Sequence, residues 1–414
     1  MLKKFTLFLI ILLLFWISFF PQPIQDKYGI ALKIFLGIFL LVLLFSRKIF
    51  QNFRLFVKDW PLWLFLACIL PNIFLAQDKK IALDTYLHLS LCLCLLFYIG
   101  KGLYNQRNAD FAHIVICICS GLVAIFGLFE VIFAFNPLYK YFISNPFYER
   151  YITSWVRPMS TLFNPAPLAS YLLVGLPSAV YIFKSKTLIK KTCGAVVLVI
   201  NCVCLILTFC RSSFLGLLAM LFFFLLIQKQ YKKTLLFVLA ASILFLLMSV
   251  LPYPFNRLSP KGIGIYGTGV FSDYRITRTK MAVNMLKTSP LTGVGLKNFR
   301  VLFDKYYPNQ NELLYVDYEI KIADNMYLTL LAETGILGLG GFLIFVFMLL
   351  RRVIKKTRKA GGSISNQIFL YPGLSLIGLF FSMVGYELFY WYTPYALFCL
   401  TCGFIQGAVY DGGI

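Results

Sequence analysis

Two stretches decide the fold: FSDYRITRTKMAVNMLKTSPLTGVGLKNFR at residues 271–300 and ADNMYLTLLAETGILGLGG at residues 323–341. The first is basic and is interrupted by glycine and proline, whereas the second returns abruptly to apolar sequence. An apolar run of about 17–25 residues is long enough to cross a bilayer as a helix. We therefore expect a charged loop that lies between two membrane spans.

The composition of the whole chain indicates a membrane protein. Of its 414 residues, 60% are hydrophobic and only 13% are charged. A soluble protein of this length could not cover its surface with so few polar side chains. We expect an all-α, polytopic membrane protein with about twelve transmembrane helices by the length criterion. The expected spans are 5–20, 28–46, 60–76, 81–99, 111–135, 165–183, 192–209, 211–227, 234–251, 325–350, 366–386 and 392–410.

Basic residues between these spans predict an orientation. Lysine and arginine gather on alternate connections, as at Lys190 and Lys191 and again at Arg351 and Arg352. Short connections rich in such residues face the cytoplasm. Both termini are then cytoplasmic, and the long loop 252–324 is exported. The expected domains are a nine-span bundle at 1–251, the exported loop at 252–324 and a three-span bundle at 325–414.

Several function classes find no support in the sequence. The net charge of +23 does not indicate nucleic-acid binding, because many basic residues belong to the cytoplasmic connections and no basic soluble domain is present. The two histidines and eleven cysteines show no zinc-site spacing. No nucleotide- or cofactor-binding motif occurs either. We expect neither a metal nor a cofactor.

Ionisable residues at the edges of spans are better candidates, since they are costly there and usually functional. Arg211 stands between two spans, and its guanidinium suits a phosphate, although snorkelling or capping the preceding helix would also explain it. Glu333 lies about two turns into its span, either as a site residue or as the partner of a buried arginine. The GVG at 293–295 predicts a tight turn whose N–H groups could also face a phosphate.

Four stretches, taken in order, resemble the O-antigen ligase and O-antigen polymerase superfamily of bacterial membrane glycosyltransferases. They are RPMSTLFNPAPLASYL (157–172), LTFCRSSFLGL (207–217), YRITRTKMAVNMLKTSPLTGVGLKNF (274–299) and DNMYLTLLAETGILGLGGF (324–342). The third is similar to the family's R-x-x-x-W-x-x-A … P-x-x-G-V-G-x-x-N-F, with Thr279 where an aromatic residue is usual. The fourth is similar to H/D-N-x-Y-L-x-x-L-x-E-x-G-I-x-G-L. The resemblance is strong over residues 200–345 and covers the N-terminal half mainly in its number of spans.

The resemblance implies transfer of a glycan from undecaprenyl diphosphate to an acceptor hydroxyl, at the periplasmic side of a bacterial inner membrane. The acceptor would be a growing glycan or lipid A-core, and membrane lipids would surround the enzyme. The departing diphosphate needs positive charge, and the acceptor must lose a proton. The family's arginines map to Arg211 and Arg275, and we expect Asp324 to take the proton. We expect transfer to be metal-independent and to invert the anomeric centre.

Asp324 departs from the ligase pattern, where a histidine is typical, and fits the polymerase branch somewhat better. It serves either as the base or as the N-cap of the next helix, where aspartate is favoured. Arg278 lies one helical turn beyond Arg275 and would share its face if this stretch is helical; its claim is weaker because a surface role would also explain it. The expected substrate-binding residues are Arg278, Asn325, Glu333, Arg157 and Asn164.

Two other functions stay open at this point. A transporter or flippase of a lipid-linked saccharide predicts ionisable residues at mid-membrane and inverted repeats. A non-catalytic membrane assembly partner predicts that neutralising Arg211 and Arg275 is tolerated. The sequence does not separate a polymerase from a ligase.

Overall fold

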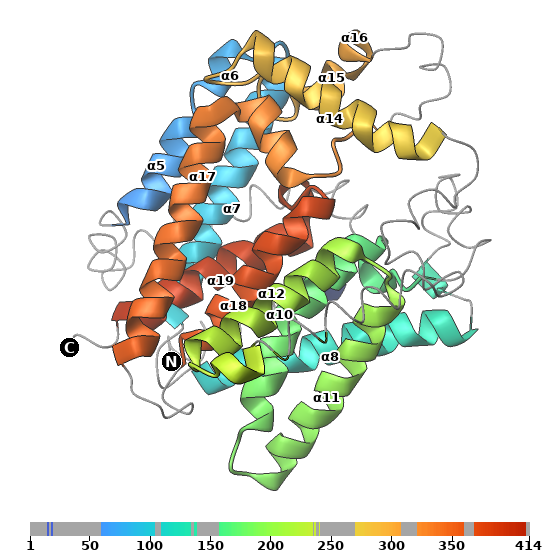
Figure 1. Ribbon diagram of the computed structural model, residues 1–414, viewed down its shortest axis with the longest axis vertical. Coiled ribbons are helices and arrows are strands. Elements are labelled where there is room, and N and C mark those ends of the chain that lie inside the picture. Colours follow the sequence, from blue (N-terminus) through green and yellow to red (C-terminus); the bar gives the residue numbers. More distant parts are fainter. Residues whose placement is uncertain are drawn as a thin grey trace.

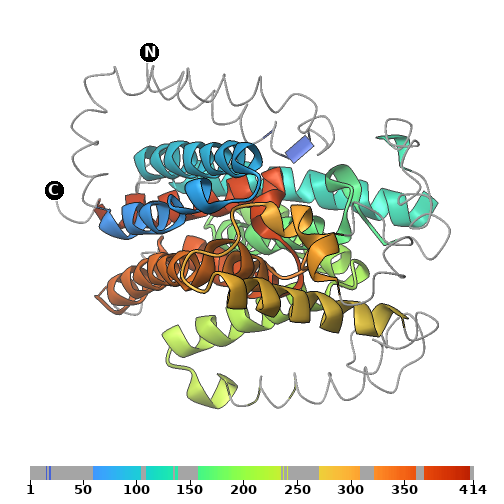
Figure 2. The same ribbon diagram turned by 90° about the horizontal axis from the view of Figure 1, so that it is seen from above.

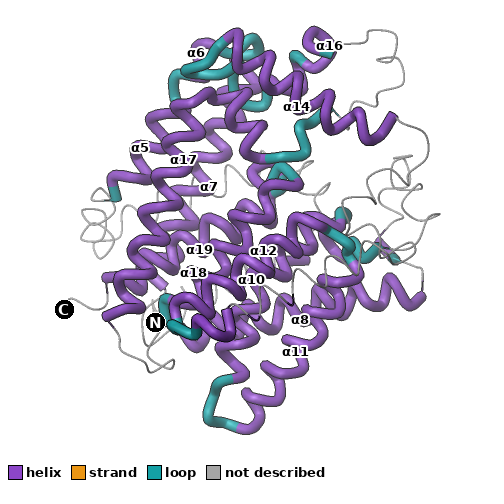
Figure 3. Tube along the Cα trace, viewed as in Figure 1, coloured by secondary structure: helices purple, strands orange, loops and turns teal. Residues whose placement is uncertain are grey.

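The computed structural model of the protein describes residues 15, 18–19, 59–103, 109–133, 136–138, 157–234, 236, 240, 270–307, 321–359 and 368–410. Within these ranges every regular element is a helix and no strand occurs (Figure 3). Five helices are long and apolar enough to cross a membrane, and three shorter apolar stretches accompany them. The all-α expectation is confirmed, while the number of spans stays a prediction. The expected spans 5–20, 28–46 and 234–251 fall almost entirely outside the described residues.

The helices follow the expected spans closely where both can be compared. They are α5 (Trp60–Ile69), α6 (Asn72–Leu75), α7 (Lys79–Leu103), α8 (Ala109–Phe133), α10 (Pro165–Phe183), α11 (Leu188–Leu207), α12 (Arg211–Ile227), α17 (Met326–Lys359), α18 (Leu370–Ser382) and α19 (Tyr392–Tyr410). The span expected at 60–76 is broken into α5 and α6, because Pro71 lacks an N–H donor and its ring would clash with the carbonyl four residues earlier.

The bundle has two closely packed groups (Figure 1). The helices α7 and α19 pack together and α5 packs on α17, while α10 contacts α8, α11 and α18. Gly100 and Gly403 allow the close approach of α7 and α19, since a Cβ on Gly403 would lie only 2.3 Å from the carbonyl oxygen of Phe97. Small residues serve the same purpose in many membrane helix pairs.

Part of the loop 252–324 is folded against the bundle. The helices α14 (Val270–Thr288), α15 (Asn298–Val301) and α16 (Phe303–Tyr306) lie together at one end of the molecule (Figure 1). Seen from above in Figure 2, α14 lies in front of the other helices. Its residues Met281 and Met285 pack with Phe299 and Phe303, and this small core extends onto Ala332 of α17. The described part of the loop, residues 270–307, therefore packs in a defined position relative to the start of α17, whereas its side of the membrane stays a prediction.

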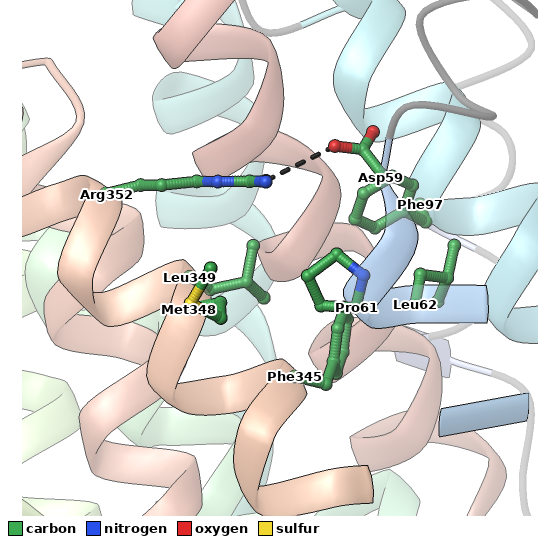
Figure 4. A pocket seen from close by; sticks show the side chains of 8 residues that line it. All are labelled: Asp59, Pro61, Leu62, Phe97, Phe345, Met348, Leu349 and Arg352. Carbon is green, nitrogen blue, oxygen red and sulfur yellow. Dashed lines mark hydrogen bonds and ion pairs between the residues drawn. The ribbon is translucent and has the colours of Figure 1, made fainter. Parts of the chain in front are cut away.

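A buried charge network holds the opposite end of α17. Asp59, which is 1% exposed, lies 2.8 Å from the amine of Lys101 and 3.3 Å from the guanidinium of Arg352, and Gln406 also bonds to it. Figure 4 shows Arg352 pointing at Asp59 above an apolar hollow that has no room for a water molecule. Arg352, one of the basic residues that predict the orientation, thus has a carboxylate partner here. We interpret the network as a device that fixes four helices, because a buried charge is stable only when paired.

Candidate functional site

The site is built around a break in α17. Gly335 has φ 64° and ψ −165°, so the helix stops there and resumes in another direction. A Cβ at this position would lie 2.4 Å from the carbonyl of Leu291, and the left-handed backbone is unfavourable for any other residue. Glycine is needed for both reasons. The sequence pattern predicts a continuous helix here and misses the break.

The loop at 290–295 fills this break. Breaking a helix frees backbone donors and acceptors that must find other partners when they are buried. The loop supplies four hydrogen-bond partners. Before the break, the carbonyls of Ala332 and Glu333 accept from the N–H groups of Val294 and Gly295, at 2.9 Å each. After the break, the N–H groups of Ile336 and Leu337 donate to the carbonyls of Pro290 and Leu291, at 3.0 and 3.1 Å. The GVG amides are therefore committed to α17, and the idea that they face a phosphate is wrong for Val294 and Gly295.

Asn298 joins the same loop to the start of α7. Its side chain is fully buried and accepts a bond of 2.8 Å from the N–H of Asp78, while its amide nitrogen donates to the carbonyl of Leu296 at 2.9 Å. Glu333 adds a second tie, because its Oε1 accepts from the N–H of Phe299 at 3.2 Å. The segment 290–299 is thus a scaffold that fixes one end of the bundle.

Glu333 has partners other than the arginine that one interpretation of the sequence gave it. Besides Phe299, it bonds to the hydroxyl of Tyr390, which itself accepts from the N–H of Lys297 at 3.2 Å. In the part of the chain that the structure describes, Glu333 therefore connects α17, the loop 290–299 and the segment before α19. A role in substrate binding stays a prediction for this residue.

The N-cap of α17 is Asn325 rather than Asp324. The Oδ1 atom of Asn325 accepts from the N–H groups of Tyr327 and Leu328 at 2.9 and 3.2 Å. This satisfies donors that the first helical turn leaves free. Asp324, one residue earlier, is consequently available for another role.

Asp324 is paired with Arg278 of α14. The guanidinium Nη1 contacts Oδ2 of Asp324, and the two side chains are 3% and 33% exposed. Arg278 is therefore buried, so the surface role that the sequence also allowed for it is wrong, while substrate binding by Arg278 stays a prediction. The same helix buries Met281, Ala282 and Met285 in the small core with Phe299 and Phe303, and this packing holds α14 against the bundle with Arg278 buried. One face of the Asp324 carboxylate is held by a buried cation, while a third of the side chain stays accessible.

Arg275 lies in the same helix as Arg278, so the condition under which the two would share a face is met. The structure describes its backbone within α14. Its side chain lies outside what is described, so its proximity to a diphosphate stays a prediction.

Arg211 is the first residue of α12, beside a turn that runs from α18 to α19. This corner, residues 383–391, contains the short 3-10 helices η8 (Met383–Gly385) and η9 (Leu388–Tyr390). Ser212 abuts Gly385 so closely that a Cβ there would lie 2.5 Å from the serine Cβ and Oγ. The beginning of α12 is thus in contact with the corner.

Glu387, in the same corner, is a residue that the sequence reasoning missed. It is 5% exposed, and its Oε1 accepts from the N–H of Ala323 at 2.9 Å and from the hydroxyl of Thr329 at 2.6 Å. Burial raises the pKa of the Glu387 carboxyl above its usual value, whereas these bonds and the nearby positive charge of Arg300 oppose the rise. The sequence did contain a signal for a functional or buried role, because Glu387 is the only charged residue of the sequence between 368 and 410.

The two remaining candidates, Arg157 and Asn164, each form a hydrogen bond with a backbone group at the end of a helix. Arg157 donates from Nε to the carbonyl of Thr208 at 2.7 Å and therefore caps the end of α11, a role that the sequence also allowed for Arg211. Asn164 caps α10 by accepting from the N–H of Ala166 at 2.9 Å. Substrate binding by Arg157 and Asn164 stays a prediction.

No group of three or more histidine, cysteine, aspartate or glutamate side chains in the described ranges is placed to hold a metal ion. The described site is instead made of arginines, an aspartate and buried glutamates. Metal-independent transfer stays a prediction.

Comparison with known proteins finds a family model that matches part of the chain. The chain matches no curated protein. Residues 196–343 match a family model described as O-antigen ligase, and this region holds Arg211, Arg278, Asp324 and the Gly335 break, but neither Arg157 nor Glu387. This match confirms, over residues 196–343, the predicted resemblance to the O-antigen ligase and polymerase superfamily.

Proposed function

We propose that this protein is a membrane glycosyltransferase that moves a glycan from undecaprenyl diphosphate to an acceptor hydroxyl. The observation that carries the proposal is the Arg278–Asp324 pair, which presents a partly accessible carboxylate at one end of the bundle. The family match supports the reaction class, because the matched region includes both residues of the pair.

The chemistry needs two kinds of group. As the acceptor oxygen bonds to the anomeric carbon, the bond from that carbon to the diphosphate breaks, and the electron pair leaves with the diphosphate. Arg211 is suited to this developing charge, since a guanidinium at the first residue of a helix adds to the positive end of the helix dipole. Arg275 completes the positive site in the proposal.

Asp324 takes the acceptor's proton in this scheme. Arg278 contacts Oδ2, so Oδ1 is the atom left for the hydroxyl. Attack from the face opposite the diphosphate inverts the anomeric carbon. The acceptor is a growing glycan or lipid A-core, and aspartate in place of the ligase histidine favours the polymerase branch.

The setting follows from the same proposal. The protein spans a bacterial inner membrane with both termini in the cytoplasm, and the site faces the periplasm. The divisions 1–251, 252–324 and 325–414 are retained as regions of the chain, although α14 packs directly on α17 and joins the last two into one structural unit.

The glycan profile of a strain that lacks the gene tests the function. Lipid A-core that carries a single repeat unit identifies a polymerase, and bare core with glycan left on the lipid carrier identifies a ligase. Carrier-linked glycan trapped on the cytoplasmic side would instead indicate a flippase. An unchanged profile would contradict the proposal, and full rescue by a gene with both Arg211→Ala and Arg275→Ala would favour a non-catalytic assembly partner.

A further inference from the structure

We propose that Glu387 is a positioning residue that sets the placement of Asp324 for glycan transfer. The inference rests on the proposed function and deepens it. Glu387 lies outside the region that matches the family model and touches none of the reacting atoms in the scheme above.

Glu387 holds the chain on both sides of Asp324. One bond comes from the N–H of Ala323, the residue directly before it, and the other comes from the hydroxyl of Thr329, in the first turn of α17. The Thr329 hydroxyl has a single proton and lies 2.6 Å from Glu387 and 3.0 Å from the carbonyl of Asn325. The shorter contact to a carboxylate is the stronger one.

The backbone of Asp324 needs such support. Its φ is 54°, in the left-handed region, which is unfavourable for a non-glycine residue unless the surroundings hold it. The side-chain ion pair with Arg278 fixes the carboxylate, while the Glu387 bonds fix the backbone from which the carboxylate projects. Loss of either set allows Asp324 to shift.

The corner that carries Glu387 also reaches the proposed diphosphate site. Gly385 lies against Ser212, next to Arg211, and two residues later Glu387 bonds to Ala323. The short segment from Gly385 to Glu387 therefore connects the start of α12 to the backbone next to Asp324. A misplacement of about 1 Å between groups that act on one substrate can lower a rate about 10²-fold.

Glu387 acts through Asp324 rather than as the base itself. Glu387 is buried, whereas Asp324 is partly exposed, and the Oε1 atom of Glu387 already accepts two bonds. An amide oxygen can accept the same two bonds, so Glu387→Gln should preserve the placement and Glu387→Ala should not.

The test measures transfer in membranes with an undecaprenyl-diphosphate-linked glycan, normalised to inserted protein. Glu387→Ala should lower kcat about 10²-fold, leave the KM for the donor within about twofold, and be rescued largely by Glu387→Gln. The matched control is Glu130→Ala, because Glu130 is also buried and accepts two backbone bonds, from Met159 and Ser160 at 2.9 and 2.7 Å.

In an Asp324→Asn background, Glu387→Ala should add less than about a twofold loss, whereas Glu130→Ala should lower the rate by the same factor in both backgrounds.

The outcomes separate the two proposals. No transfer by the wild type refutes the proposed function. Transfer by the wild type together with an unchanged kcat in Glu387→Ala overturns the positioning role, as does an equal loss in the Asp324→Asn background. If Glu387→Ala fails to insert, Thr329→Val removes one bond alone: a lowered kcat at unchanged donor KM supports the inference, and an unchanged kcat overturns it.

Discussion

Asp324 and Arg278 form an ion pair between residues that are 46 positions apart in the chain. The arginine is buried beneath the accessible aspartate, and the pair joins α14 to the start of α17. This arrangement holds Oδ2 of Asp324 on the arginine while a third of the aspartate side chain stays exposed. The pair also gives Arg278 a definite role, which is to hold the Asp324 carboxylate in place.

The first prediction concerns Arg278. Arg278→Ala should lower glycan transfer about 10²-fold by releasing Asp324, and Arg278→Lys should rescue it poorly, because an ammonium does not reproduce the planar guanidinium. Transfer is measured in membranes at matched protein amounts. The control is Lys280→Ala, which removes an exposed positive charge from the same helix and should leave transfer unchanged. Equal activity of Arg278→Ala and Lys280→Ala would show that the ion pair has no role in transfer.

Asp324 and Asn325 allow a second, closely matched comparison. Asp324→Asn should reduce the transfer rate by about 10²–10⁴-fold, the usual contribution of acid–base assistance. Asn325→Asp should retain the helix cap, since aspartate and asparagine cap about equally well, and should keep most of the activity. Initial rates of both variants are compared at saturating donor. Full activity in Asp324→Asn would leave proton removal to water or to the departing diphosphate.

Gly335 and Gly340 give a stability test within one helix. Gly335→Ala places a Cβ against Leu291 and imposes a left-handed backbone on alanine, so it should destabilise by more than about 1–2 kcal/mol. Gly340 has nothing within 4 Å of its would-be Cβ, and Gly340→Ala should stabilise the helix by about 0.5–1 kcal/mol. Thermal unfolding of the purified proteins in detergent measures both. Similar melting temperatures for the two variants would contradict the assignment of a break at Gly335.

The orientation can be tested with fusions. A reporter that is active only outside the cytoplasm should be active when fused near Asn309 and silent when fused near Lys356. Each fusion must be inserted to a similar level for the comparison to count. The reverse pattern would overturn the orientation that we predict from the basic connections and would place the site on the cytoplasmic side.

Sequence reasoning found the elements of this protein better than the contacts between them. Apolar length predicts where α7, α10 and α19 lie, and the Asp-Asn before α17 predicts a helix start within one residue. The Arg278–Asp324 pair depends on how α14 folds back on α17, which no local pattern reveals. The break at Gly335 was missed for the same reason, because the loop that satisfies its freed backbone groups is some 40 residues away.

Glu387 was missed for a different reason. The residues around it are aromatic and of the kind that is enriched at membrane interfaces, yet Tyr386 beside it is buried. A single carboxylate in a long uncharged stretch is costly in such surroundings and could have been taken as a sign of a specific partner. Its two donors, Ala323 and Thr329, become apparent only when α17 and the corner are seen together.

Glycan transfer can be followed with purified components. Purified protein in lipid vesicles is given an undecaprenyl-diphosphate-linked glycan and an acceptor glycan, and both the lengthened glycan and the released undecaprenyl diphosphate are quantified. The wild type and Arg351→Ala should each form one released diphosphate for every glycan transferred, and Arg211→Ala should be slower by about 10²-fold or more. No product from the wild type, or the same rate from Arg211→Ala, would contradict the proposed transfer.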